Sequence, residues 1–381
     1  MENRPIASIQ HHFSALEDPR IDRTKLHKLM DIVIIAICAV ICGADTWVDV
    51  ESFGHAKLAW LKTFLELPNG IPSHDTFGRV FAMLDPDQFQ QCFLDWVMAV
   101  SQVIPGQVIA IDGKTLRQSH DKRLGKGAIV MVSAWATANR LVLGQAKVDD
   151  KSNEITAIPE LLRVLDISGC IITIDAIGCQ KEIAADIVEQ GADYLLALKG
   201  NQGRIHEDVE LLFDDLEASQ FTAYAYDYAQ TINKDHGRIE TRECWTIADA
   251  EVLRHLRDAQ HWDKLTAVVK VRAERRTGSE TTVEDRYFLS SLPGNAQNLL
   301  TAVRSHWGIE NHLHWVLDIA FREDDCRIRK DHGHQNFAIL RHIAINLLKQ
   351  EKTLRIGIKA KRLRAGWDEQ YLLKALSGLF S

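Results

Sequence analysis

Residues 108–112 are Val-Ile-Ala-Ile-Asp, and residues 171–175 are Ile-Ile-Thr-Ile-Asp. Each stretch is a short, mostly apolar run, typical of a buried strand, that ends at an aspartate. In open α/β sheets the ligand sites lie beyond the carboxyl ends of the strands, so Asp112 and Asp175 can face one cleft. The alternative is that each aspartate only begins a turn after its strand, which is common.

The residues around these two stretches predict a mixed sheet. From residue 107 onward the pattern indicates three strands, two of them joined as a hairpin, and then helices that alternate with further strands. A hairpin followed by crossovers favours an α/β (mixed) fold with helices on both faces of the sheet. The predicted strands are 108–111, 129–135, 141–148, 170–174 and 194–198, and the predicted helices are 154–165 and 180–189.

Three further segments flank this core, which we assign to residues 104–200. Residues 1–103 have apolar positions at helical spacing and predict a small helical domain, either a packing or dimerisation module or a helix-turn-helix that binds DNA. Residues 201–292 predict a β-rich insertion with a helix and four strands. Residues 293–381 return to helices. The four predicted strands are 221–229, 238–247, 265–272 and 281–290.

Glu310 lies within a predicted helix, 306–320, and supplies a third acid. At helical spacing it shares a largely apolar face with Leu313, Leu317 and Phe321. An ionised carboxylate on such a face is costly unless it is paired or binds a metal. The alternatives are an ion pair with Arg304 or a histidine, or a position at the exposed rim of the face. Three converging carboxylates would suit Mg²⁺, with Mn²⁺ as a substitute.

The formal net charge of −7 argues against a uniformly positive surface. Any contact with DNA must therefore come from local basic clusters. The densest cluster is the segment 349–364, with seven basic residues and one acid, Glu351; its alternative interpretation is a solvated helix face. The seven basic residues are Lys349, Lys352, Arg355, Lys359, Lys361, Arg362 and Arg364.

Cysteine spacing and hydropathy bear on the cellular compartment. The seven cysteines form no CxxC pair, and the longest apolar run, 32–42, is about half as long as a membrane span requires. No leader with a cleavage site precedes that run. We therefore expect a cytoplasmic protein without a membrane segment.

Motifs distributed over nearly the whole chain resemble those of the H-repeat-associated proteins, which belong to the ISAs-type insertion-sequence transposases. The resemblance implies a ribonuclease-H-like catalytic core with a β-rich insertion before the last acidic helix. The matching motifs are GIPSHDT (70–76), IAIDGKTLR (109–117), KSNEI (151–155), IDA (174–176) with Gln180, LKGNQ (198–202), HGR (236–238) with Glu240 and Arg242, HWGIEN (306–311), LHW (313–315), Leu317-Asp318 and RHIAIN (341–346).

Carried over by motif, the resemblance implies that Asp112, Asp175 and Glu310 are the catalytic and metal-binding acids. Related DDE transposases often have a tyrosine and an arginine before the glutamate and a lysine seven residues after it. Those positions here are Val303, His306 and Leu317, so we expect Arg304, His306 or His314 to hold phosphate instead. The expected DNA-binding residues are Lys114, Arg117, Lys199, His236, Arg238, Arg242, Arg304, His306 and His314.

The predicted function is Mg²⁺-dependent cleavage of element ends and strand transfer on double-stranded DNA by a homodimer. One alternative is a nuclease or resolvase with the same core that does not join strands. Another is an inactive relative that only binds DNA. A second acidic group, Glu323-Asp324-Asp325 with Asp318 nearby, could replace Glu310 if the register of the helix differs.

Overall fold

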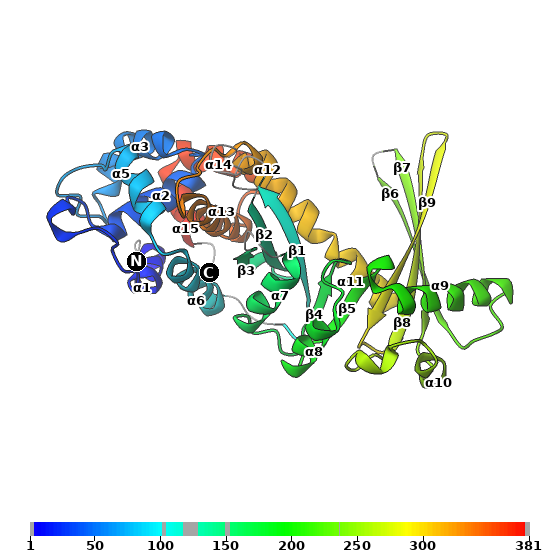
Figure 1. Ribbon diagram of the computed structural model, residues 1–381. Helices are drawn as coiled ribbons and strands as arrows, with labels where there is room; N and C mark the ends of the chain where they lie inside the picture. Colours follow the sequence, from blue (N-terminus) through cyan, green and yellow to red (C-terminus); the bar gives the residue numbers. More distant parts are fainter. Residues whose placement is uncertain (1–3, 101–103, 117–128, 149–152, 236, 378–381) are drawn as a thin grey trace.

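A computed structural model describes residues 4–100, 104–116, 129–148, 153–235 and 237–377 (Figure 1). The described strands form one mixed sheet in the order β3-β2-β1-β4-β5-β9-β8-β7-β6. β1, β2 and β3 are antiparallel neighbours, whereas β1, β4 and β5 are parallel. The strands are β1 (Val108–Leu116), β2 (Ile129–Ala136), β3 (Leu141–Lys147), β4 (Ile171–Ile174), β5 (Asp193–Leu198), β6 (Asp227–Asp235), β7 (Arg238–Ile247), β8 (Ala267–Thr277) and β9 (Glu280–Ser290). The mixed α/β fold predicted from the sequence is confirmed.

Helices cover both faces of this sheet, as the alternation of buried side chains along its strands requires. Leu195 of β5 packs with Leu299 and Val303 of α11 (Ala296–His306), while the next residue, Leu196, belongs to the large core on the other face. Successive side chains of a strand point to opposite faces, so α11 lies opposite that core. α7 (Glu154–Arg163) and α8 (Lys181–Glu189) pack into the large core. The bounds of both helices are close to those predicted from the sequence.

The predicted β-rich insertion extends the sheet instead of forming a separate barrel. β9 pairs antiparallel with β5, from Leu195↔Ser290 to Leu198↔Tyr287, and β8, β7 and β6 follow outward. In Figure 1 these strands project from one end of the molecule, beside α9 (Gly203–Ala218) and α10 (Ala250–Arg254).

The first predicted strand of the insertion, 221–229, is wrong in its bounds, because β6 begins at Asp227. The apolar residues that suggested it have another use: Phe221 stacks on Trp245 with 6.0 Å between ring centroids and contacts Tyr226. β6 itself carries polar residues on a largely exposed hairpin, so it lacks the alternation that identifies a half-buried strand.

The N-terminal helices share one hydrophobic core with the C-terminal helices. α13 packs against α2, α5 and α6, and its buried Asn336 donates to the carbonyls of Phe81 and Leu84 at 2.8 and 2.9 Å. Figure 1 shows these blue and brown-to-red helices interleaved at one end of the molecule. The predicted 1–103 segment is therefore not packed as a self-contained unit. The helices are α1 (Arg4–Phe13), α2 (Leu29–Ile41), α3 (Trp47–Ala56), α4 (Leu58–Leu61), α5 (His74–Met83), α6 (Pro86–Val100), α12 (Trp315–Phe321), α13 (Gly333–Gln350), α14 (Ile358–Trp367) and α15 (Glu369–Ser377).

The apolar run 32–42 forms most of α2, which is buried on every side from Asp31 to Ile41. A helix that is apolar all round is stable only where other elements enclose it, and here α13, α3 and α14 do so. None of the helices that the structure describes combines the length and the apolar character needed to cross a bilayer.

The basic segment 349–364 is only partly a surface patch, which corrects the prediction from its composition. Lys361 is buried, donates to the carbonyl of Leu348 and pairs with Glu351 at 3.3 Å. Arg362 is also buried and donates to the carbonyl of Val40 and to Asp45. These two cations tie α14 to the helical core, because the ends of neighbouring elements leave carbonyls that need donors.

Asn346 links α13 to the edge strand β3 and gives a test of this packing. Its amide accepts from the N–H of Val142 at 2.8 Å and donates to the carbonyl of Val142 at 2.9 Å, and the side chain is fully buried. Asn346→Ala leaves both backbone groups unsatisfied, so we expect a loss of about 2 to 4 kcal/mol in the free energy of unfolding by urea. Gln350→Ala, which removes one partly exposed bond to Asn139, should cost about 1 kcal/mol or less. Equal losses in the two variants would contradict the assigned role of Asn346.

Candidate active site

The parallel pairing of β1 with β4 places the two aspartates at adjacent positions. Their register runs from Val108↔Ile171 to Ile111↔Ile174, so Asp112 and Asp175 are the next residue on each strand. β1 continues beyond the predicted end at 111 and keeps pairing with β2, with Asp112 opposite Ser133. Asp175 leaves the sheet, and its Oδ1 accepts from the N–H of Ile177 at 3.1 Å. Its carboxylate is thereby held beside that of Asp112.

Glu310 begins a π-helical turn, Glu310–His314, between α11 and α12. The N–H of Trp315 donates to the carbonyl of Glu310, five residues earlier. The wider turn changes the angle between successive side chains, so Leu313 and His314 are buried while Glu310 is exposed. The prediction that Glu310 shares an apolar face is therefore wrong, because it assumed regular α-helical spacing. π turns within α-helices are frequent at functional sites.

The charges of Asp175 and Glu310 both act on Asp112. Burial, followed by the charges of Asp175 and Glu310, raises the pKa of Asp112 from 3.8 to about 7. A like charge nearby disfavours ionisation, and the Asp112 side chain is only 16% exposed to the solvent that could screen it. The site thus concentrates negative charge in a poorly solvated place.

Glu154, at the start of α7, adds a fourth carboxylate that the sequence-based site omitted. Its Oε1 lies so close to Gly113 that a Cβ built on that glycine would be 2.1 Å away. Burial and the charge of Asp175 raise the pKa of Glu154. The signal in the sequence was the glycine directly after Asp112, since a residue without a side chain permits this close approach.

Two predicted phosphate ligands, His314 and His306, lie beside the aspartates. His314 is buried with its Nδ1 3.5 Å from Oδ2 of Asp112, and burial lowers its pKa to about 4, so it is neutral at pH 7. The Nδ1 of His306 is 3.0 Å from Oγ1 of Thr173, and burial lowers its pKa. His314 therefore contacts Asp112 directly, whereas His306 contacts the strand that leads to Asp175, and neither neutral imidazole supplies positive charge for phosphate.

Lys114 does not extend toward solvent, because its ammonium group lies among the carboxylates of the second acidic group. Its Nζ lies 2.6 Å from Asp318, 2.9 Å from Glu323 and 3.3 Å from Asp324. Glu323 is 3% exposed and also faces Arg341 at 3.6 Å. These acids are already held in ion pairs with cations of the chain itself, so they are not a replacement for Glu310. Lys114 is equally not free to bind a DNA phosphate.

The other predicted DNA-binding residues lie on the β5 and insertion side of the site. Lys199 and Arg304 are exposed, at the ends of β5 and α11. Arg242 pairs with Glu240 at 2.7 Å, and Arg238 lies 3.7 Å from the same carboxylate. Arg304 is close enough to Arg242 to lower its pKa, although burial is the larger cause. Arg117 and His236 lie outside the described residues.

The donor set fits a hard divalent cation. Asp112, Asp175, Glu310 and Glu154 offer only oxygen ligands, and their mutual repulsion would be relieved by a bound cation. Among the residues the structure describes, no three His, Cys, Asp or Glu side chains are already close enough together to hold a metal.

The strand order β3-β2-β1-β4-β5, with acids on β1 and after β4, is that of a ribonuclease-H-like core. Residues 104–347 match the family model described as the Transposase DDE domain, and residues 10–97 match the model described as DDE_Tnp_1-associated. The first match covers more than half of the 381 residues. The chain belongs to the DDE transposase family, for which DNA is the substrate.

Full-length relatives support this assignment. The chain is 43% identical over 380 residues to the "H repeat-associated putative transposase YhhI" of Escherichia coli K12, covering 98% of both proteins. It is 41% identical over 373 residues to the "Putative transposase YncI" of Escherichia coli O157:H7, covering 98% of this chain and 95% of the relative. The resemblance to H-repeat-associated proteins is thereby confirmed.

The pKa of Asp112 gives a prediction about stability. The fold disfavours its ionised form, so the folded protein loses stability as pH rises from about 4, where the unfolded carboxyl titrates, to about 7. Asp112→Asn removes this cost. Without divalent ions, we expect the variant to be more stable than the wild type by more than about 1 kcal/mol at pH 8, with the difference shrinking as the pH falls toward 4.

Urea unfolding at several pH values in EDTA measures this difference. Glu160→Gln, an exposed carboxylate on the same helix as Glu154, is the matched control and should leave the pH profile unchanged. An Asp112→Asn protein no more stable than the wild type at pH 8 would mean that a cation of the chain already compensates Asp112.

Proposed function

We propose that this chain is the transposase of a bacterial insertion sequence, which cleaves the ends of its element and joins them to target DNA. The observation that carries the proposal is the parallel register that puts Asp112 and Asp175 at adjacent positions, together with the effect of the Asp175 and Glu310 charges on the pKa of Asp112. All seven cysteines are free, which fits action in the reducing cytoplasm.

In this proposal Asp112, Asp175 and Glu310 hold divalent cations, with Glu154 as an additional ligand. Mg²⁺, or Mn²⁺ in its place, would supply neutralisation of the phosphodiester and activation of a water or a 3′ hydroxyl. His314 lies against the carboxylate of Asp112, and His306 contacts Thr173, two residues before Asp175 on the same strand segment. Because cleavage and joining require the same neutralised phosphodiester, one site can serve both reactions.

The cations on the β5 and insertion side would hold the DNA backbone near the acids. Lys199 and Arg304 are exposed and can each contact a phosphate, while Arg238 and Arg242 are positioned by Glu240. Contacts to phosphate fix the position of DNA without selecting its sequence. We extend this role to Arg117 and His236 on the strength of the family motifs alone.

Two alternatives share the same core. A nuclease or resolvase would hydrolyse DNA without forming a strand-transfer product. An inactive relative would bind DNA only; one relative, 44% identical over 75 residues, carries the name "Inactive transposase YbfQ". The four carboxylates favour an active enzyme, since their repulsion has a cost that DNA binding alone does not require.

The catalytic assignment is tested on DNA carrying the inverted repeats that flank the gene, with Mg²⁺. Asp112→Ala, Asp175→Ala and Glu310→Gln should each reduce cleavage and strand transfer by about 1,000-fold or more, because metal stabilisation of the transition state is worth several kcal/mol. Glu160→Gln should retain full activity. Full activity in any one of the three variants would remove that residue from the site, and cleavage without joined product would favour the nuclease.

Cleavage at both ends of an element also predicts a homodimer on DNA. Each protomer contributes one set of Asp112, Asp175 and Glu310, so two ends held together require two protomers. Sedimentation of the protein with the two ends should give a complex of two chains and two DNA ends. A monomer that holds both ends would contradict the dimer without affecting the catalytic assignment.

A further inference from the structure

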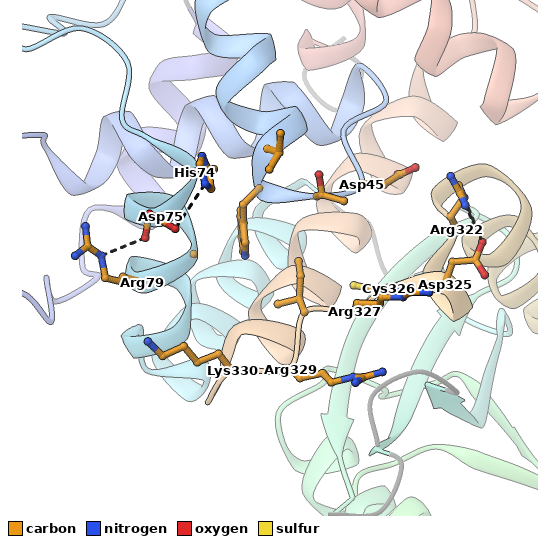
Figure 2. Close-up of a pocket in the computed structure, with 15 residues that line it drawn as sticks. Asp45, His74, Asp75, Arg79, Arg322, Asp325, Cys326, Arg327, Arg329 and Lys330 are labelled. Carbon is orange, nitrogen blue, oxygen red and sulfur yellow. Dashed lines mark hydrogen bonds and ion pairs between the residues drawn. The ribbon is translucent and has the colours of Figure 1, made fainter. Parts of the chain in front are cut away.

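A cleft of about 650 Å³ lies between the N-terminal helices and the segment that follows α12. One wall comes from α3 and α5, with Trp47 and Arg79, and the other from residues 322–330. In Figure 2, His74, Asp75 and Arg79 lie on one side of the cleft, Arg322 and Asp325 on the other, and Arg329 and Lys330 along its lower edge. The cleft is thus formed where the two family-matched parts of the chain meet.

The second wall is a cationic strip with a fixed backbone. Ile328 is partly buried against the hydrophobic core, whereas Arg327 and Arg329 on either side of it are exposed. The N–H of His332 donates to the carbonyl of Ala82 at 3.2 Å, which anchors the strip to α5. Cations on a backbone held at both ends lose less freedom on binding than cations on a mobile loop.

The cleft has more positive than negative charge. Two of its acids are already paired with arginines: Asp325 with Arg322 at 3.2 Å, and Asp45 with the buried Arg362 at 3.0 Å. The third acid, Asp75, lies 3.6 Å from Nε2 of His74.

Arg329 already takes part in another interaction within the chain, so three of the exposed cations remain. Within the described part of the chain, Arg79, Arg327 and Lys330 have no carboxylate at ion-pair distance, and all three are exposed. On a protein of net charge −7, such a local surplus marks a surface for a polyanion.

The cleft also adjoins the candidate active site. Lys114, two residues after Asp112 on β1, bonds to Glu323 and Asp324, which lie between the cleft residues Arg322 and Asp325 in the sequence. This cluster joins the strand that carries Asp112 to the wall of the cleft. A polyanion that passes the acids is therefore directed along the cleft.

We propose that this cleft binds the phosphate backbone of duplex DNA next to the bond that is cut, with Arg79 from one wall and Arg327 and Lys330 from the other. The identity of the polyanion rests on the proposed function, while the charge surplus does not. The inference gives the N-terminal helices a DNA-binding role through one wall of a cleft, without a helix-turn-helix.

The test measures binding of a fluorescein-labelled duplex of mixed sequence by anisotropy, in EDTA, over a range of salt concentrations. Each phosphate contact contributes about 0.9 to the slope of log affinity against log salt, so Arg327→Gln with Lys330→Gln should reduce the slope by about 1.8. Arg79→Gln should reduce it by about 0.9. All three positions are exposed, so thermal unfolding should remain unchanged.

The matched control is Lys62→Gln with Arg163→Gln, two exposed cations outside the cleft with no ion pair among the described residues. Wild-type slope in this control supports a local contact, whereas an equal loss in both double variants would indicate a general charge effect and overturn the proposal. An unchanged slope in the cleft variants would also overturn it. Because the assay lacks metal, failure here is independent of failure of the Asp112, Asp175 and Glu310 variants.

Cys326 provides a second readout, because it is partly exposed and lines the cleft. Duplex DNA carrying disulfide-activated tethers on its phosphates should form a mixed disulfide with Cys326, releasing the activating thiol. The adduct should be absent in Cys326→Ser and should form more slowly in the Arg327 and Lys330 double variant. Coupling that persists unchanged in Cys326→Ser would place the DNA elsewhere.

Discussion

The parallel pairing of β1 with β4 is the constraint on which the rest of the site depends. Because the register aligns Ile111 with Ile174, the next residue of each strand is an aspartate, and neither can move away without breaking buried backbone hydrogen bonds. Burial of both strands between two layers of helices fixes this register, since a slip of one residue would exchange the side chains that pack on the two faces. The fold thus imposes a repulsion between carboxylates that free chains would avoid.

Most of the core could be predicted from the sequence, because its strands are short apolar runs and its helices have regular spacing. The pair Asp112 and Asp175 followed from the same patterns. Glu154 was missed because its proximity to Gly113 depends on how α7 packs on the sheet. No local pattern specifies that packing.

The other incorrect predictions have a common physical cause: the side chains concerned contact residues that are distant in the sequence. Phe221 and Tyr226 suggested a strand, but Phe221 stacks on Trp245 and Tyr226 contacts Phe221. Lys361 and Arg362 suggested a DNA-binding surface but serve backbone carbonyls inside the helical core. A cluster of basic residues in the sequence is therefore a poor predictor of a cationic surface where buried helix ends nearby need hydrogen-bond donors. The cationic cleft, in contrast, draws on positions nearly 250 residues apart, such as Arg79 and Arg327, and no single segment is notable for it.

The π turn at Glu310 has a consequence for comparison among relatives. Such a turn holds one residue more than an α-helical turn, so deletion of a single residue between Glu310 and His314 would restore a regular helix. The helical segments on either side of the deletion would keep nearly the same relative rotation, because the wider turn had already absorbed the extra residue. A homologue that has lost this one residue would therefore keep the packing of α11 and α12 while changing the direction of the side chains within the turn that holds the glutamate.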